Sequence, residues 1–239
     1  MRLAIAILLL ALTCNGQEYL QHRRTAFRTT ATAASGLSKT SLFAWFDFDS
    51  AADAHSTYTL VESNAPAYTS GYGSSLASGT NCWRQSTIGS KFYTNNVDMS
   101  FVIRYRGVAG IVAGSFIVHG WNGRVAVRWY TTGNVVYFGL SSSLTLSAAV
   151  TNTWYCLIAQ YTAADNSLDV WVNNGTVTEA SGTSTVGSGA LLIGRGTDAT
   201  MTSTFDIDYL GFFNRLLTSD ERTWLYNSGG TRTYSELSP

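Results

Sequence analysis

The sequence has little charge, few lysines and few prolines. Charged residues make up 13% of the 239 residues, and the 15 basic and 15 acidic residues give a formal net charge of zero. Lysine occurs only at Lys39 and Lys91, and proline only at Pro66 and Pro239. Nucleic-acid-binding proteins and polybasic membrane binders need clustered positive charge. We therefore expect no nucleic-acid partner.

The residues in excess favour strands and turns. The chain holds 30 Thr, 27 Ser and 22 Gly, and aromatic residues reach 13%. Thr, Val and aromatic residues are enriched in strands, whereas Lys and Glu are depleted there. A neutral chain that is 45% hydrophobic is also unlike a disordered one. The composition predicts a folded β protein.

The N-terminus has the order of a secretory signal peptide. Met1-Arg2 is a basic start, an apolar run extends from Leu3 to Leu12, and the small residues Cys14 and Gly16 precede Gln17. The run is shorter than the roughly 20 apolar residues that span a bilayer, and no second run follows. We expect a secreted protein with no membrane span. An apolar first strand and a lipoprotein signal that uses Cys14 remain open.

The expected organisation has three parts. Residues 1–16 form the signal peptide. Residues 17–40 combine three arginines with a Thr/Ala/Ser stretch and show no period of 2 or 3.6, which predicts a flexible linker or arm. Residues 41–239 form the folded domain.

Two cysteines remain after cleavage, Cys82 and Cys156. In a secreted chain they permit one disulfide. Two buried free thiols are the alternative, and the sequence does not give the Cα separation that decides between them. The chain has no CxxC motif and no Cys/His cluster, so zinc is not supported.

Short alternating or apolar segments separated by turns predict the strands. In Met99–Val108, Phe101, Ile103 and Tyr105 fall on one face and Arg104 and Arg106 on the other, as in a half-buried strand. The further segments are Ser41–Asp49, Ser115–His119, Arg124–Thr131, Asn134–Leu140, Thr153–Tyr161, Ser167–Val172, Thr176–Glu179, Ala190–Gly194 and Phe205–Asn214. Strands without helical crossovers indicate an antiparallel sandwich or barrel.

Two local signals are specific. Asn173-Asn174-Gly175 predicts a tight hairpin turn, and Asn174-Gly175-Thr176 within it is the only glycosylation sequon of the chain. Thr218 and Glu221 fit a capping box that begins a helix, and Gly229-Gly230 is a natural stop.

The order of three segments matches a known family. They are LFAWFDFDSAADAHS near the start, Thr153–Asn174 with its Trp-Tyr strand and following turn, and ALLIGRG with FDIDYLGFFNRLLTSDERTWLYNSGG near the end. Together they resemble the laminin G-like, concanavalin A-like lectin/glucanase jelly-roll domains, in particular their pentraxin-related branch. The resemblance covers about residues 41–237. The extra Asn174 before Gly175 departs from the family and predicts a longer turn.

The resemblance implies an all-β fold, a two-sheet antiparallel jelly-roll sandwich with one short C-terminal helix. It also implies binding of glycans or proteins more often than catalysis. Asp208 would pair with backbone or Arg donors near the final helix. The residues expected to fill the core are Trp154, Ile193, Ile207, Leu210 and Leu217, together with Trp45, Trp171 and Trp224.

The sequence predicts that the protein is not an enzyme and has no catalytic residues. Glucanases with this jelly roll resemble one another through a strand that carries two Glu and an Asp at alternate positions, which places the carboxylates on one face. The five glutamates of this chain are scattered, and Asp206-Ile207-Asp208 is the nearest approach to that pattern. The chain also lacks a G-x-S-x-G motif and a phosphate-binding loop.

A calcium site is left open, with no other cofactor expected. Calcium takes six to eight oxygen ligands, which loops rich in Asp can supply. The candidates are Asp47, Asp49 and Asp53 in the first turn and Asp198 and Asp206 near the last strands. Asp residues that cap turns are the alternative, since Asp is enriched in turns.

The candidate carbohydrate-binding residues are His119, Trp121, Asn122 and Arg124. Gly120 and Gly123 indicate a loop, and loops on rigid sandwiches carry recognition. Trp121 offers a stacking face and the polar side chains offer hydrogen bonds to hydroxyls. Alternatively, Trp121 folds back and caps the sandwich.

Four further side chains are candidates for a surface role. Arg128 and Tyr130 would extend the loop surface along the next strand. Trp83 and Tyr93 lie in surroundings rich in Gly and Ser and are weaker candidates.

Two functions follow from these observations. The first is a secreted, non-catalytic carbohydrate-binding or adhesion module that binds a glycan or glycoprotein surface. The alternative is a structural or host-attachment protein on the surface of a bacteriophage virion. The alternative predicts self-association, so an oligomer is open.

Overall fold

The structure is a computed structural model, and part of the chain is described. The described residues are 36–52, 54–55, 58–63, 66–69, 71–74, 82–85, 88, 97–108, 111, 115–120, 125–129, 135–138, 143–146, 149–182, 190–194 and 204–239. Residues 1–35, which include the predicted signal peptide and most of the predicted linker, lie outside them.

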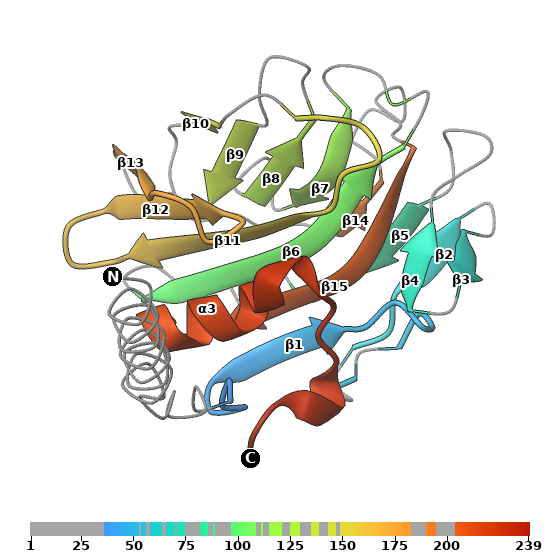
Figure 1. Ribbon diagram of the computed structural model, residues 1–239, viewed down its shortest axis with the longest axis horizontal. Helices are drawn as coiled ribbons and strands as arrows, with labels where there is room; N and C mark the ends of the chain where they lie inside the picture. Colours follow the sequence, from blue (N-terminus) through green and yellow to red (C-terminus); the bar gives the residue numbers. More distant parts are fainter. Residues whose placement is uncertain are drawn as a thin grey trace, which may run out of the picture. The chain divides into compact units, whose positions relative to one another are not determined.

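Two antiparallel sheets pack face to face between Gly36 and Pro239 (Figure 1). The eight-stranded sheet has the order β13 (Thr178–Ser181), β12 (Ser167–Val172), β11 (Tyr155–Thr162), β6 (Met99–Gly107), β15 (Phe205–Phe213), β4 (Tyr72–Ser74) and β3 (Ala67–Thr69), and β1 (Leu42–Phe46) also pairs with β15. The seven-stranded sheet has the order β10 (Leu144–Thr145), β9 (Val135–Phe138), β8 (Val125–Arg128), β7 (Phe116–Gly120), β14 (Leu191–Ile193), β5 (Cys82–Gln85) and β2 (Val61–Ser63). The predicted all-β sandwich with a short C-terminal helix is confirmed.

The main core fills the space between the sheets. Period-2 alternation on β6 points Phe101, Ile103 and Tyr105 into it, as predicted. Residues from the facing sheet, such as Val118 and Ile193, complete it. Trp83 is fully buried in this core, so its assignment as a surface candidate was wrong. Its indole Nε1 donates to the hydroxyl of Tyr68 at 2.7 Å.

A second apolar layer lies on the outer face of the eight-stranded sheet, beneath helix α3 (Ser219–Tyr226). Trp45, Val102 and Tyr209 belong to it, and the Tyr209 hydroxyl donates to the carbonyl oxygen of Leu225 on the helix at 2.9 Å. Figure 1 shows α3 lying across β6 and β15. The expected half-buried β6 is therefore buried on both faces along most of its length, because the helix covers the second face.

Capping residues set the ends of α3. The backbone N–H of Glu221 donates to Thr218 Oγ1 at 3.3 Å, and the N–H of Thr218 donates to Glu221 Oε2 at 2.9 Å, which confirms the capping box. The helix ends at Asn227, whose φ of 45° is left-handed, rather than at Gly229-Gly230. Two short 3-10 turns follow, η2 (Asn227–Gly229) and η3 (Tyr234–Glu236).

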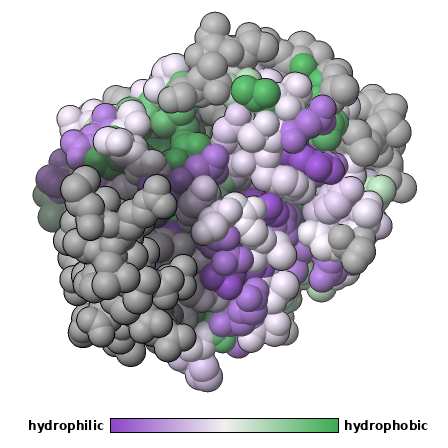
Figure 2. All heavy atoms as spheres, in the orientation of Figure 1, coloured by the Kyte–Doolittle hydropathy of each residue, from purple (hydrophilic) through white to green (hydrophobic). Residues whose placement is uncertain are grey.

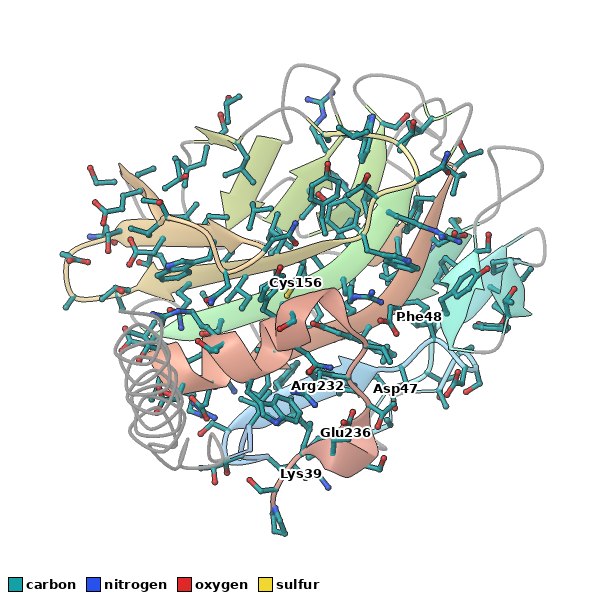
Figure 3. The ribbon with its side chains drawn as sticks, viewed as in Figure 1. Lys39, Asp47, Phe48, Cys156, Arg232 and Glu236 are labelled. Atoms are coloured by element: carbon teal, nitrogen blue, oxygen red, sulfur yellow. The ribbon has the colours of Figure 1, made fainter. Side chains whose placement is uncertain are left out.

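The two ends of the described domain lie side by side. Leu37 is fully buried, Ser38 forms a parallel bridge with Ser238, and the Lys39 N–H donates to the Ser238 carbonyl oxygen at 2.8 Å. Figure 3 shows Lys39 and Asp47 beside the C-terminal segment. Residues 36–40 therefore belong to the folded domain, although the predicted linker included them.

Candidate functional site

Beyond the end of α3, the outer face of the eight-stranded sheet carries polar and aromatic side chains instead of apolar ones. Arg104 and Arg106 are two residues apart on β6, so both point to this face. β11 runs beside β6 with Cys156 opposite Arg104, which brings Trp154 level with Arg106. Tyr72 is two residues from Ser74, which pairs with Asp206 on β15. We call Tyr72, Arg104, Arg106 and Trp154 the Trp154 patch.

Trp154 lies over both arginines of the patch. The guanidinium carbon of Arg104 is 4.4 Å from the Trp154 ring centroid, and that of Arg106 is 4.9 Å away. The Tyr72 ring meets Trp154 edge-on, with centroids 5.9 Å apart at 70°, and Arg106 is also 5.3 Å from the Tyr72 centroid. Trp154 is half-buried, so part of its ring stays exposed beside the two guanidiniums.

Two buried carboxylates hold the arginines in place. Asp208 accepts a hydrogen bond from Arg104 Nη1, and Asp206 Oδ2 accepts one from Arg106 Nε at 2.6 Å. Asp206 is 1% exposed and Asp208 3%. Burial raises the pKa of Asp208, and the Thr231 hydroxyl and Arg104 offset this only in part. The predicted pairing of Asp208 with an Arg donor near the final helix is confirmed.

Asp206 and Asp208 are two residues apart on β15, so alternation places both on one face, and an irregularity brings Tyr209 to the same face. The register of β15 against β6 shifts between Ile207 and Tyr209, which is a β-bulge. Asp206, Asp208 and Tyr209 can therefore all point outward, although strict alternation would separate Asp208 from Tyr209. Arg104 Nη2 also donates to the carbonyl oxygen of Gly229 at 2.6 Å, so the patch is tied to the segment after α3.

The Trp154 patch combines aromatic rings with hydrogen-bond donors. Among the described residues, no group of three or more His, Cys, Asp and Glu side chains could hold a metal ion. A partly exposed indole with a neighbouring guanidinium offers an apolar stacking face beside hydrogen-bond donors. Figure 2 shows that the molecular face around α3 and the C-terminal segment is mostly hydrophilic or intermediate in hydropathy.

The predicted binding loop is largely outside the described residues. Trp121, Asn122 and Arg124 lie there, and so do Tyr130 and Tyr93. His119 is described, and it lies within β7 with 7% of its surface exposed, opposite Leu192 and Ala126 on the neighbouring strands. This agrees with the predicted strand Ser115–His119, and β7 continues one residue further, to Gly120. The binding role of the loop stays a prediction.

The other candidate tryptophans are less buried than predicted. Trp45 is fully buried, as expected. Trp154, Trp171 and Trp224 are half-buried, and each lies against a guanidinium. Trp171 and Trp224 also pack against the apolar layer beneath α3. The Arg222 guanidinium carbon, for example, is 4.1 Å from the Trp171 ring. Alternation alone could not distinguish an apolar contact from a cation–π contact.

Two of the described aspartates considered for calcium, Asp47 and Asp206, have protein partners. Asp47 Oδ1 accepts from the Trp45 indole N–H at 2.5 Å and from the Tyr234 backbone N–H at 3.1 Å. Asp206 pairs with Arg106, while Asp53 and Asp198 lie outside the described residues. Asp47 thus behaves as the turn-capping alternative predicts.

The two cysteines are free and buried, in different sheets. Cys156 lies on the outer face of β11 beneath α3 (Figure 3), with its sulfur 3.4 Å from the Tyr209 hydroxyl. Burial raises the pKa of its thiol to about 11. Of the two alternatives left by the sequence, the structure has the free thiols.

Comparisons with known proteins place the fold. No protein-family model and no curated protein matches the chain. Among solved structures, it is similar to the sialidase of Trypanosoma rangeli in complex with 2,3-difluorosialic acid, with a TM-score of 0.60 at 13% identity over 80% of this chain and 33% of that chain. It is also similar to the botulinum neurotoxin serotype D binding domain, with a TM-score of 0.62 at 9% identity over 78% of this chain and 51% of that chain.

These matches show a shared β-sandwich fold. The chain spans about a third of the length of the sialidases it matches and about half of the toxin structure. The finer laminin G-like assignment stays a prediction, since no family model matches.

The prediction that the protein is not an enzyme is contradicted by the same comparison. The matched sialidases are enzymes, and their chains contain this fold. The sequence argument rejected one catalytic design, the strand of paired carboxylates found in glucanases. Its absence does not exclude other catalytic designs, so the scattered glutamates carry no conclusion about catalysis.

Proposed function

We propose that this protein is a carbohydrate-binding or adhesion module and that the Trp154 patch is its glycan-binding surface. The observation that carries the proposal is the position of Trp154. Its ring is held over two guanidiniums, which are in turn held by buried carboxylates. A ring fixed before binding loses little conformational freedom when a sugar stacks on it.

The patch offers both components of sugar recognition. The apolar face of a pyranose can stack on the exposed part of the half-buried Trp154 ring. The Arg106 side chain is 28% exposed, and its Nη atoms make no hydrogen bond with the described residues, so they can donate to sugar hydroxyls. One similar structure is a sialidase in complex with sialic acid, a carbohydrate, and another is a toxin binding domain. These precedents support the proposal.

The proposal is tested by removing the stacking ring. Trp154→Ala should weaken glycan binding by about 1–2 kcal/mol, or roughly 5- to 30-fold in Kd, the typical contribution of an aromatic stacking contact. Because Trp154 is half-buried, the variant should stay folded and lose about 1–3 kcal/mol of stability. The measurement is titration calorimetry with oligosaccharides selected on a glycan array.

Trp171→Ala is the matched control. Trp171 is also half-buried and also lies against an arginine, but it lies beside Arg222 of α3. Its loss should lower stability without changing the Kd. Equal losses of affinity in the two variants would show that binding depends on general stability, and an unchanged Kd in Trp154→Ala would remove the patch from consideration.

We also propose that the protein acts outside the cell. The basic start, apolar run and small residues of 1–16 support this proposal. Intact-mass analysis of protein secreted by an expressing host should find Gln17 as the first residue. A secreted protein that retains Met1 would contradict it. Among the described residues, no helix has the length and apolar character of a membrane span.

A further inference from the structure

The arginines of the Trp154 patch are already neutralised by the protein. Arg104 donates to Asp208, and Arg106 donates to Asp206, so two positive charges meet two negative ones. The formal charge of the patch with its two aspartates is therefore zero. A surface that selects anionic sugars would instead present uncompensated arginines, which bind carboxylates through paired hydrogen bonds.

Asp206 cannot easily give way to a ligand. It is 1% exposed, and its Oδ1 accepts a hydrogen bond from Ser74 Oγ at 2.7 Å while Oδ2 accepts from Arg106. An anionic sugar that approached Arg106 would place a second carboxylate near Asp206. Two carboxylates at one guanidinium repel each other, which offsets the attraction of the arginine.

We infer that the patch binds neutral glycans and discriminates against sialylated ones. This inference rests on the proposed function and names its ligand class. The Trp154 ring supplies a stacking face that requires no charge, and the exposed end of Arg106 donates to hydroxyl oxygens. Neutral sugars also release no bound ions on association, so affinity should hardly depend on salt.

The test compares sialylated N-glycans with the same glycans after removal of sialic acid. Binding is measured by calorimetry at low and at physiological ionic strength. The desialylated glycans should bind at least as tightly as the sialylated ones, with less than a twofold change between the two salt concentrations. The inference would be overturned if sialylated glycans bound at least tenfold more tightly than desialylated ones and this difference disappeared at the higher salt concentration. That result would leave the proposed function standing. No binding of either set would remove both.

A charge variant sharpens the test. Asp206→Asn keeps the shape and an acceptor for Ser74 but leaves Arg106 uncompensated. It should raise the affinity ratio of sialylated to neutral glycans by threefold or more, and this gain should disappear at higher salt. Asp165→Asn is the control, because it makes the same charge change at an exposed turn. An equal rise of this affinity ratio in both variants would assign the effect to net charge and overturn the inference. If Asp206→Asn does not fold, the binding measurements on the wild-type protein at the two salt concentrations decide whether the inference holds.

Discussion

Gly211→Ala tests whether the sheet and its outer apolar layer pack as described. Gly211 lies in β15, and Trp45 of β1 covers it. A methyl group at this position would lie 2.6 Å from Trp45 Cε3, 2.8 Å from Cζ3 and 3.0 Å from Val102 Cγ1. Optimal carbon–carbon contacts are about 3.5–4.0 Å, so the added carbon is about 1 Å too close.

Trp45 has little room to move away. It is fully buried, it stacks on Tyr209 with centroids 5.1 Å apart at 18°, and its Nε1 donates to Asp47 at 2.5 Å. Overpacking a core typically costs about 1–3 kcal/mol, and a fixed indole places this site at the upper end. For a domain of this size, about 3 kcal/mol corresponds to a fall in Tm of about 6–12 °C.

The assay is thermal and urea unfolding, with Gly120→Ala as the matched control. Gly120 is also a buried strand glycine, but its added carbon would meet the flexible end of Leu191 at 3.2 Å. That variant should lose less than about 1 kcal/mol. Adding Trp45→Leu to Gly211→Ala should cost less than the sum of the two single changes, because the smaller side chain removes the clash. Equal effects of the two glycine variants, or full additivity, would refute the packing argument.

Three further predictions concern the helix cap, the thiols and the hairpin. The hydrogen bonds from Arg215 and from the helix cap lower the pKa of Glu221 below its ordinary 4.5, although burial raises it. Glu221→Gln should therefore lower the free energy of unfolding by about 1–2 kcal/mol at pH 7. Urea unfolding should show this difference between wild type and variant at all pH values above 4.5, and the difference should disappear as the pH falls through the lowered pKa of Glu221 in the folded protein. Neither Cys82 nor Cys156 should react with a thiol reagent in the folded protein, and both should react once it unfolds. A disulfide between them in the unfolded protein would contradict the prediction that both thiols are free. Asn174 is exposed at the hairpin tip with a φ of 55°, so a eukaryotic host that secretes the protein should attach a glycan to it. Replacing Thr176 of the sequon should abolish this glycan, and a secreted wild-type protein with only the unmodified mass would contradict the prediction.

Local signals were sufficient for the long strands and the helix. Alternation over Met99–Val108 predicted β6 almost to the residue, and the capping box placed the start of α3. β3 and β4 were missed because each has only three residues and lies in a stretch without a clear period. Such short strands form because they pair with strands that are distant in the sequence, as Ser74 of β4 does with Asp206 of β15.

The candidate site was not predictable for a related reason. The alternation of Arg104 and Arg106 was recognised, but Trp154 lies about fifty residues away, and only the pairing of β6 with β11 brings them together. The bulge that places Tyr209 on the same outward face as Asp208 leaves no mark in a pattern of alternating residues. The family resemblance therefore placed Trp154 in the core, whereas its contacts are two guanidiniums and the edge of Tyr72.

The position of the glycan site can be measured directly from the indole N–H signals of isotopically labelled protein. Each tryptophan gives one such signal, and single Trp→Phe variants assign them. Titration with a glycan that binds should shift the Trp154 signal and leave the Trp171 signal in place, because only Trp154 belongs to the patch. A titration that shifts the Trp121 signal and leaves Trp154 unchanged would place binding at the loop after β7 and contradict the proposed site.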